Sequence, residues 1–292
     1  MAGALSQHRT GIVLVVAAAV AWSTAPFFTR LLPFDSWTIL FWRGLFGGGL
    51  IAAILVLTQG RAGLRELTGM GSNGWLVASL STLGMGCFIP ALQLTSVSNV
   101  AIIVATGPFV TAALAWIWLR EAAHLRTMLA SVVALCGVAI IVGDARIGSD
   151  ILGIGLACVM TLAIAAMTVT VRRHKNTPMV AAAAWSNVLG SIVSIPFALG
   201  MWSVAVTDLF VFAMFGFFQV AIGLTLFIVG SRLLPSGQAS LIATLETPLM
   251  PFWVWLAFHE APTSRALVGG ALVMGAVIAD IIGDNSTSTD AA

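Results

Sequence analysis

Ten apolar runs, each long enough to cross a lipid bilayer as a helix, account for most of this chain. The hydrocarbon core of a bilayer is spanned by about 20 predominantly apolar residues in helical form. The sequence therefore predicts an all-α integral membrane protein with ten transmembrane helices. These spans are expected near residues 11–31, 36–58, 73–94, 98–119, 125–143, 151–171, 178–200, 207–231, 236–258 and 263–283.

The composition excludes several other classes of protein. Hydrophobic residues make up 59% of the chain and charged residues 8%, against roughly 25% charged residues in an ordinary soluble domain. So few charges cannot cover a soluble enzyme of 292 residues, and the chain is neither disordered nor a disulfide scaffold. The single lysine, Lys175, leaves no basic tract for nucleic acid. The histidines and cysteines show no metal-ligand spacing, so neither a metal nor a cofactor is expected.

The basic residues in the loops predict the orientation of the chain. If the loops alternate between two sides, nine arginine and lysine residues lie on the side of the N-terminus and three on the other. An excess of arginine and lysine marks the cytoplasmic side of a membrane. We therefore expect a bacterial inner-membrane protein with both termini in the cytoplasm. Its expected partners are the lipid bilayer and a small-molecule substrate, and it is expected to function as a monomer.

The two halves of the chain resemble each other. Ala105-Thr106-Gly107-Pro108 corresponds to Leu245-Glu246-Thr247-Pro248, and Val142-Gly143-Asp144 corresponds to Ile282-Gly283-Asp284. The chain is therefore interpreted as two repeats, residues 1–145 and 146–292. Because each repeat has an odd number of spans, the second must enter the membrane with opposite polarity. Two inverted five-helix repeats are typical of carriers that open a site near the midplane alternately to either side.

Several short motifs carry a resemblance to a known family. They are Ala91 to Ala101, Pro108, Leu119-Arg120-Glu121 and Gly137-Val138 in the first half, and Ser236-Gly237-Gln238-Ala239, Pro248 and Glu260 in the second. With these motifs the chain resembles the EamA-type family of the drug/metabolite transporter superfamily. Within that family it is most similar to the YddG-like exporters of aromatic and other amino acids.

The resemblance has consequences for both fold and function. It implies a central cavity lined by spans one, three, four, six, eight and nine, with spans five and ten at the periphery. It also implies alternating-access export of small metabolites, here amino acids including aromatic ones. Spans one and six contain no acid, which favours facilitated uniport over proton coupling.

Two charged residues inside predicted spans are candidates for the substrate site. Glu246 lies deep in the ninth span, where a charge costs about 2.5–3.5 kcal/mol on insertion scales. It either contributes to function or bridges neighbouring helices. Arg43 lies seven residues into the second span. Its side chain could extend toward the outer face, pair with a carboxylate of the protein or bind a substrate carboxylate.

Aromatic and polar residues within other spans complete the candidate site. Trp22, followed by Ser23, lies twelve residues into the first span, where its ring could stack on an aromatic or cationic ligand. Asn99 and Thr106 share a helical face, as do Phe215 and Gln219, although simple packing would also explain these residues. The full set of candidate substrate-binding residues is Trp22, Ser23, Arg43, Met85, Asn99, Thr106, Trp185, Phe215, Gln219 and Glu246.

Other features of the spans have structural interpretations. The prolines Pro26, Pro90, Pro108, Pro196, Pro248 and Pro251 would bend their helices, either as parts of gates or as static curvature. Trp253, near the end of its span, is expected among the tryptophans of the membrane interface. The pairs Gly44 with Gly48 and Ala271 with Gly275 predict close helix packing.

Three other functions stay open on the sequence. A proton-coupled multidrug exporter of organic cations would use Glu246, although small relatives in the superfamily carry an essential glutamate in their first helix, which is absent here. A carrier of nucleotide sugars or phosphorylated metabolites would need deep basic residues, and Arg43 alone is available. A membrane-embedded enzyme would need a nucleophile–base pair or a metal cluster, and the sequence shows neither.

Overall fold

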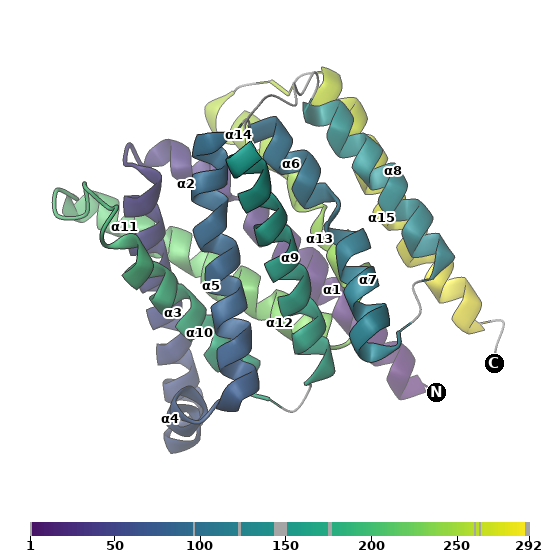
Figure 1. The fold of residues 1–292 in the computed structure, drawn as a ribbon, viewed down its shortest axis with the longest axis horizontal. Helices are drawn as coiled ribbons and strands as arrows, with labels where there is room; N and C mark the ends of the chain where they lie inside the picture. Colours follow the sequence, from purple (N-terminus) through teal and green to yellow (C-terminus); the bar gives the residue numbers. More distant parts are fainter. Residues whose placement is uncertain are drawn as a thin grey trace.

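The described part of the chain consists of helices and their connections, with no strand (Figure 1). The computed structural model describes residues 2–95, 97–121, 124–142, 151–174, 177–259, 261–262 and 264–289. This confirms the predicted all-α class. The predicted boundary between the repeats, at residues 145 and 146, lies outside the described residues and stays a prediction.

Each predicted span coincides with one helix or with consecutive helices in line. In the first half these are α1 (Ala2–Ser23), α2 (Ala25–Leu31), α3 (Ser36–Gln59), α5 (Gly71–Leu94), α6 (Val97–Ala105), α7 (Gly107–Leu119) and α8 (Leu125–Val142). In the second half they are α9 (Ile151–Arg173), α10 (Met179–Ser194), α11 (Val206–Phe215), η1 (Gly216–Leu224), α12 (Thr225–Ser231), α13 (Ser236–Ala243), α14 (Glu246–Phe258) and α15 (Ser264–Thr289).

Length and hydropathy support the membrane assignment. Within the described residues, six segments are long and apolar enough to cross a bilayer: Gln7–Leu31, Ser36–Gln59, Ile151–Arg173, Val206–Ser231, Ser236–Phe258 and Ser264–Gly283. Gly107–Leu119, Leu125–Ile141 and Met179–Ser194 are shorter apolar helices. Many large apolar side chains on their outer faces are exposed, as expected for helices that face lipid.

Two connections contain features of their own. The seventh span was expected to reach residue 200, but α10 ends at Ser194 and turns follow it. Between α3 and α5 lies a short helix that the sequence did not predict, α4 (Arg61–Thr68). Gly63 of α4 packs so closely on the carbonyl of Leu55 that a Cβ atom would not fit there.

Three spans are broken at a threonine that precedes a proline. Proline lacks the N–H group of a helical hydrogen bond and clashes with the carbonyl four residues earlier. Each threonine has nearly the same backbone conformation and donates its hydroxyl to the carbonyl three residues before it. The bonds are Thr24 to Ala21 (2.6 Å), Thr106 to Ile103 (2.6 Å) and Thr244 to Leu241 (2.6 Å).

The prolines therefore differ in effect. Pro26, Pro108 and Pro248 follow these breaks, whereas Pro90 lies within the continuous helix α5 and Pro251 within α14. The breaks of the fourth and ninth spans, at Thr106 and Thr244, lie within two residues of corresponding positions of the two repeats. The breaks thus divide each of these spans into two half-helices, α6 with α7 and α13 with α14.

A π-helix, η1, lies in the middle of the eighth span. Two glycines let this segment approach its neighbours closely. A Cβ atom on Gly216 would lie 2.7 Å from the backbone nitrogen of Gly47, and one on Gly223 would lie 2.6 Å from the ring of Trp22. Because π-helical turns often accompany functional sites, η1 marks the region between α1 and α3.

The helices pack in a pattern that is repeated in the two halves. α3 packs along α10, and α7 packs against α13. The contact of α5 with α9 corresponds to that of α1 with η1 and α12. At the edge of the bundle, α8 and α15 lie side by side (Figure 1), which agrees with the expected periphery for spans five and ten.

Close glycine contacts hold several of these pairs. Gly44 and Gly48 of α3 face the backbone of α10, as predicted, while Gly137 and Gly269 form the tight crossing of α8 and α15. Gly275 has open space around its Cβ position, so the prediction of a tight contact there was wrong.

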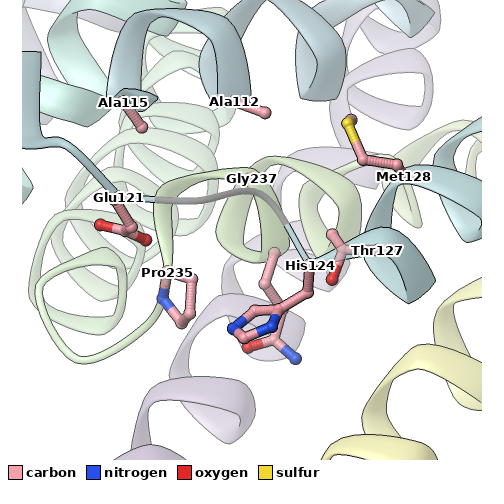
Figure 2. A pocket seen from close by; sticks show the side chains of 9 residues that line it. Ala112, Ala115, Glu121, His124, Thr127, Met128, Pro235 and Gly237 are labelled. Carbon is pink, nitrogen blue, oxygen red and sulfur yellow. The ribbon is translucent and has the colours of Figure 1, made fainter. Parts of the chain in front are cut away.

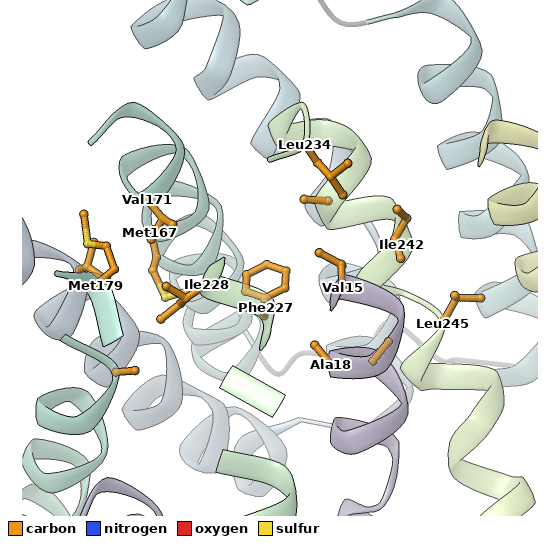
Figure 3. Packing of buried hydrophobic residues seen from close by; sticks show 14 of the residues in the cluster. Val15, Ala18, Met167, Val171, Met179, Phe227, Ile228, Leu234, Ile242 and Leu245 are labelled. Atoms are coloured by element: carbon orange, nitrogen blue, oxygen red, sulfur yellow. The ribbon is translucent and has the colours of Figure 1, made fainter. Parts of the chain in front are cut away.

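The largest apolar cluster surrounds α1 and α13 (Figure 3). Val15 and Ile242 have no exposed surface, and Phe227 and Ile228 of α12 pack in the same cluster. Buried methylene and methyl groups of this kind fix how the half-helix α13 lies against α1.

The two ends of the bundle differ in how tightly they close. We call the end where α1 begins and α15 ends the terminal side, and the opposite end the far side (Figure 1). On the terminal side α7 and α13 pack together, and five residues of α13 are buried. On the far side, the described residues of α6 and α14 do not form a comparable contact, and no residue of α14 is buried.

Candidate functional site

The break in the first span joins three elements through Trp22 and Ser23. The ring of Trp22 lies 4.9 Å from the ring of Phe227 and directly against Gly223. The buried hydroxyl of Ser23 donates to the carbonyl of Val20 (2.7 Å). That hydroxyl also accepts a hydrogen bond from the indole Nε1 of Trp253 in α14 (2.7 Å). The predicted pair Trp22 and Ser23 therefore connects α1 with η1, α12 and α14.

From the sequence, Trp253 was expected among the tryptophans of the membrane interface. Its indole N–H points inward to Ser23 instead. Trp253 stands seven residues after Glu246 in α14, so the two side chains share a helical face roughly 10 Å apart along the axis. That spacing was the signal in the sequence that could have placed Trp253 in the site.

Glu246 is the first residue of α14, directly after the break in the ninth span. Its side chain is half-buried, and no side chain or backbone group of the described residues forms a hydrogen bond or ion pair with its carboxylate. The start of a helix favours a negative charge because the unpaired N–H groups of its first turn carry partial positive charge. The predicted acid therefore lies at a half-helix N-terminus and has no ion-pair partner within the described protein.

Thr106, the counterpart of Glu246 in the first repeat, has a different environment. Its hydroxyl is committed to the carbonyl of Ile103, so its main visible role is in the break itself. Asn99 belongs to α6, but its side chain lies outside the described residues. The two equivalent breaks thus differ in charge, as the sequence predicted.

A second group lies between the second and eighth spans. Arg43 of α3 is buried, and its Nη1 donates a hydrogen bond to Oε1 of Gln219 in η1. The guanidinium carbon lies 5.6 Å from the ring centre of Phe215. That ring stacks on Phe28 of α2 at 4.9 Å. The structure therefore brings three of the predicted site residues, Arg43, Phe215 and Gln219, into direct contact.

Two other predicted residues lie apart from these groups. The indole N–H of Trp185 donates to the carbonyl of Leu67 (2.8 Å), and its ring lies 5.4 Å from that of Trp75. These contacts anchor α10 to the end of α4 and the start of α5, at the terminal side. Met85 is half-buried in α5, and none of the contacts described above involves it.

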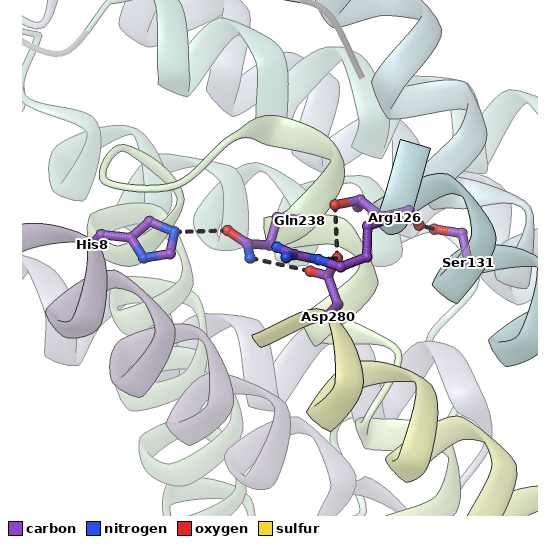
Figure 4. Close-up of polar contacts among 6 residues, drawn as sticks. His8, Arg126, Ser131, Gln238 and Asp280 are labelled. Atoms are coloured by element: carbon purple, nitrogen blue, oxygen red, sulfur yellow. Dashed lines mark hydrogen bonds and ion pairs between the residues drawn. The ribbon is translucent and has the colours of Figure 1, made fainter. Parts of the chain in front are cut away.

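The terminal side is held by a polar network that the sequence did not predict (Figure 4). Asp280 of α15 is fully buried and accepts hydrogen bonds from Thr127 of α8 (2.8 Å) and Gln238 of α13 (3.1 Å). Its Oδ1 lies 3.5 Å from Nε of Arg126. Gln238 Oε1 in turn bonds with Nε2 of His8 in α1 (2.9 Å). Hydropathy hides Asp280, because it stands in an otherwise apolar span.

A second set of polar contacts joins the loops next to this network. Glu121 accepts a hydrogen bond from the backbone N–H of Ser236 (3.1 Å), and its other oxygen lies 3.7 Å from Nε of Arg172. Arg172 also donates to the carbonyl of Arg232 (2.6 Å). These contacts tie the ends of α7 and α9 to the start of α13.

A small hollow separates the two sets of contacts (Figure 2). Glu121, His124, Thr127 and Gln238 are among its lining residues. Its volume is about 20 Å³, room for a single water molecule. This hollow is too small to admit a solute.

Apolar helices with inverted halves, interrupted spans and polar groups in their interior define a multi-pass membrane transporter. The EamA-like transporter family matches residues 9–143 and 151–279, which is once in each half and nearly the whole length. The chain belongs to the EamA-like transporter family.

Individual relatives agree with this assignment. The chain is 24% identical over 276 residues to a protein named "Uncharacterized transporter" from Archaeoglobus fulgidus, covering 92% of this chain and 96% of the relative. A solved structure titled "Crystal structure of protein" superposes with a TM-score of 0.82 at 16% identity, over 94% of this chain and 98% of the other. At that identity the structural likeness concerns the fold alone.

Proposed function

We propose that this transporter exports amino acids, including aromatic ones, from the cytoplasm by facilitated uniport, as the YddG-like branch does. The observation that carries the proposal is the group at the helix breaks. The unpaired carboxylate of Glu246 stands on the same face of α14 as Trp253, which bonds to Ser23 beside Trp22. A carboxylate suits the ammonium group of an amino acid, and the aromatic residues suit an apolar side chain.

The differing closure of the two ends supports an alternating-access cycle. On the terminal side α7 packs on α13 and polar contacts join the helix ends, while no residue of α14 on the far side is fully buried. Cytoplasmic termini, expected from the charge bias, would make this the outward-facing state of a bacterial inner-membrane protein. The proposed protein is a carrier and not an enzyme, functions as a monomer in the bilayer and binds no nucleic acid.

A specific observation favours one alternative, a proton-coupled exporter of organic cations. Glu246 has no partner among the described residues, so a proton and a cationic solute could compete for its carboxylate. Spans one and six, however, supply no second acid. Overflow of a metabolite down its own gradient requires no coupling, and we therefore propose uniport.

Transport by the purified protein in lipid vesicles distinguishes facilitated uniport from proton-coupled export. We expect downhill efflux of phenylalanine and alanine, and no accumulation when a pH gradient is the sole driving force. Glu246→Gln should keep downhill transport within about tenfold, equivalent to about 1.4 kcal/mol. Glu66→Gln, outside the spans in α4, is the matched control. Accumulation under a pH gradient that Glu246→Gln abolishes would establish proton coupling, and vesicles that release neither amino acid would contradict the proposed substrate class.

A further inference from the structure

One edge of the Arg43 guanidinium has no partner among the described residues. Nη1 is bonded to Gln219. Nε is buried and lacks a hydrogen-bond acceptor, and no described residue accepts a hydrogen bond from Nη2. Nε and Nη2 lie on the same edge of the planar group, and two parallel N–H groups of this kind match the two oxygens of a carboxylate. The unbonded edge is therefore a fork with the geometry that a carboxylate requires.

The positive charge of Arg43 also lacks a counter-charge. No acidic side chain in the described ranges forms an ion pair with it. The residue is 8% exposed, inside a membrane-spanning helix. A buried charge without an opposite charge is strongly unfavourable, and the amide of Gln219 and the ring of Phe215 compensate only part of that cost. An anionic ligand would supply the missing charge.

The surrounding contacts hold the guanidinium in one place. Gly216 brings η1 against the backbone of α3, with its Cβ position 2.9 Å from the carbonyl of Arg43. This approach places Gln219, three residues later, within hydrogen-bond reach. Phe215 lies under the guanidinium and is itself stacked on Phe28. The side chain is thus positioned between two spans and does not extend to the membrane surface.

We propose that the Nε–Nη2 edge of Arg43 is the subsite for the carboxylate of the exported solute, with Gln219 and Phe215 as positioning residues. This inference rests on the proposed function and narrows its substrate class to solutes that carry an anionic group. It also gives different roles to the two charged residues of the candidate site. Arg43 binds the carboxylate, and the carboxylate of Glu246 remains for the ammonium group. A solute that carries the ammonium group alone would leave the fork of Arg43 empty.

The test compares phenylalanine with phenylalaninamide, which has the same ring and ammonium group but no carboxylate. In vesicles, wild-type protein should transport phenylalanine faster by roughly ten- to a hundredfold, the range for a charge-assisted hydrogen-bonded pair. Arg43→Lys keeps the charge and loses the fork, so it should slow phenylalanine by about tenfold or more and leave the amide rate unchanged. Gln219→Leu should act in the same direction.

Arg30→Lys provides the matched control. Arg30 also lies over a phenylalanine ring, that of Phe258 at 5.8 Å, but near the far end of the first span. The control should preserve the ratio of the two rates. Equal wild-type rates for both solutes, or an equal loss of both in folded Arg43→Lys protein of normal Tm, would overturn the carboxylate subsite while leaving amino-acid export intact. Transport of the amide alone would overturn both proposals.

Discussion

Trp22 shows at the residue scale how packing and a binding role can be combined in one side chain. Its ring contacts Phe227 and Gly223 on one side of the first span, yet it is not fully buried. The neighbouring residue, Ser23, is fully buried and bonded to Trp253. A ring fixed in this way is available to a ligand without the loss of side-chain freedom that a mobile ring would suffer on binding.

Replacing this ring should alter selectivity among amino acids. Trp22→Ala is expected to slow efflux of phenylalanine several-fold more than efflux of alanine, because lost stacking amounts to about 0.5–1.5 kcal/mol beyond area burial. Efflux from vesicles containing both solutes measures the ratio directly. Trp185→Phe, which removes the bond to Leu67 away from the site, should leave the ratio unchanged. An equal loss of both solutes in Trp22→Ala would show that the ring only packs.

At the scale of elements, Asp35 shows how the start of one helix is fixed. Its carboxylate accepts hydrogen bonds from the backbone N–H of Trp37 (3.0 Å) and of Thr38 (2.9 Å), and from the Thr38 hydroxyl (2.5 Å). Partial burial raises the pKa of Asp35, but these bonds and the backbone N–H of Gly200 outweigh it and leave the pKa below its ordinary value of 3.8. The same carboxylate thus caps α3 and holds the turns after α10.

The cap should make stability depend on pH. Because the folded protein favours the carboxylate, Asp35 stabilises the fold above pH 3.8, and this contribution is lost as the pH falls through the lowered pKa. Asp35→Ala should cost about 0.5–2 kcal/mol of stability at neutral pH. The difference in Tm between the two proteins should shrink below pH 3.8. A Tm difference that stays constant down to pH 2.5 would argue against a role for the ionised cap.

The network around Asp280 acts at the same scale, since it joins α8, α13 and α15 and reaches α1 through His8. Asp280→Asn should weaken the closure of the terminal side, because the amide replaces the charge that faces Arg126. We expect faster labelling of a cysteine placed at Ala112, which lines the hollow beside the network, in a background without the three native cysteines. Unchanged labelling at a lowered Tm would indicate a purely structural network.

The elements differ in how far sequence could predict them. The spans followed from apolar length, which depends on each segment alone. The breaks did not, because Pro26 and Pro108 interrupt their spans whereas Pro90 does not, and the difference lies in the local threonine bond. Contacts such as Arg43 with Gln219 join residues 176 positions apart. They depend on how α3 packs on η1, which no local pattern reveals.

At the scale of the whole molecule, the orientation in the membrane is the main prediction. The nine-to-three distribution of basic loop residues places both termini in the cytoplasm. A reporter that is active only in the periplasm, fused after Ala292, should stay silent. The same reporter inserted after Pro33, in the connection between α2 and α3, should be active in cells. Reversed signals at the two positions would invert the topology.

The two residues bonded across α8 and α15 in the polar network of the terminal side, Thr127 and Asp280, have apolar counterparts in the other repeat. Corresponding positions of the repeats are 140 residues apart, as in Pro108 and Pro248, so Asp280 and Thr127 correspond to Ile140 and Leu267. Those apolar residues cannot form the same bonds. We therefore expect the resting protein to favour the state closed at the terminal side, so that a solute arriving there must first shift that equilibrium, which weakens its apparent affinity.

In kinetic terms the two faces should then saturate differently. A passive carrier must have the same ratio of Vmax to KM in both directions, since it cannot create a gradient. The KM for loading from the terminal side should nevertheless exceed the KM for loading from the far side, with Vmax higher in proportion. Such a carrier would transport little solute at ordinary concentrations. When the solute accumulates, the transport rate would rise almost in proportion to its concentration.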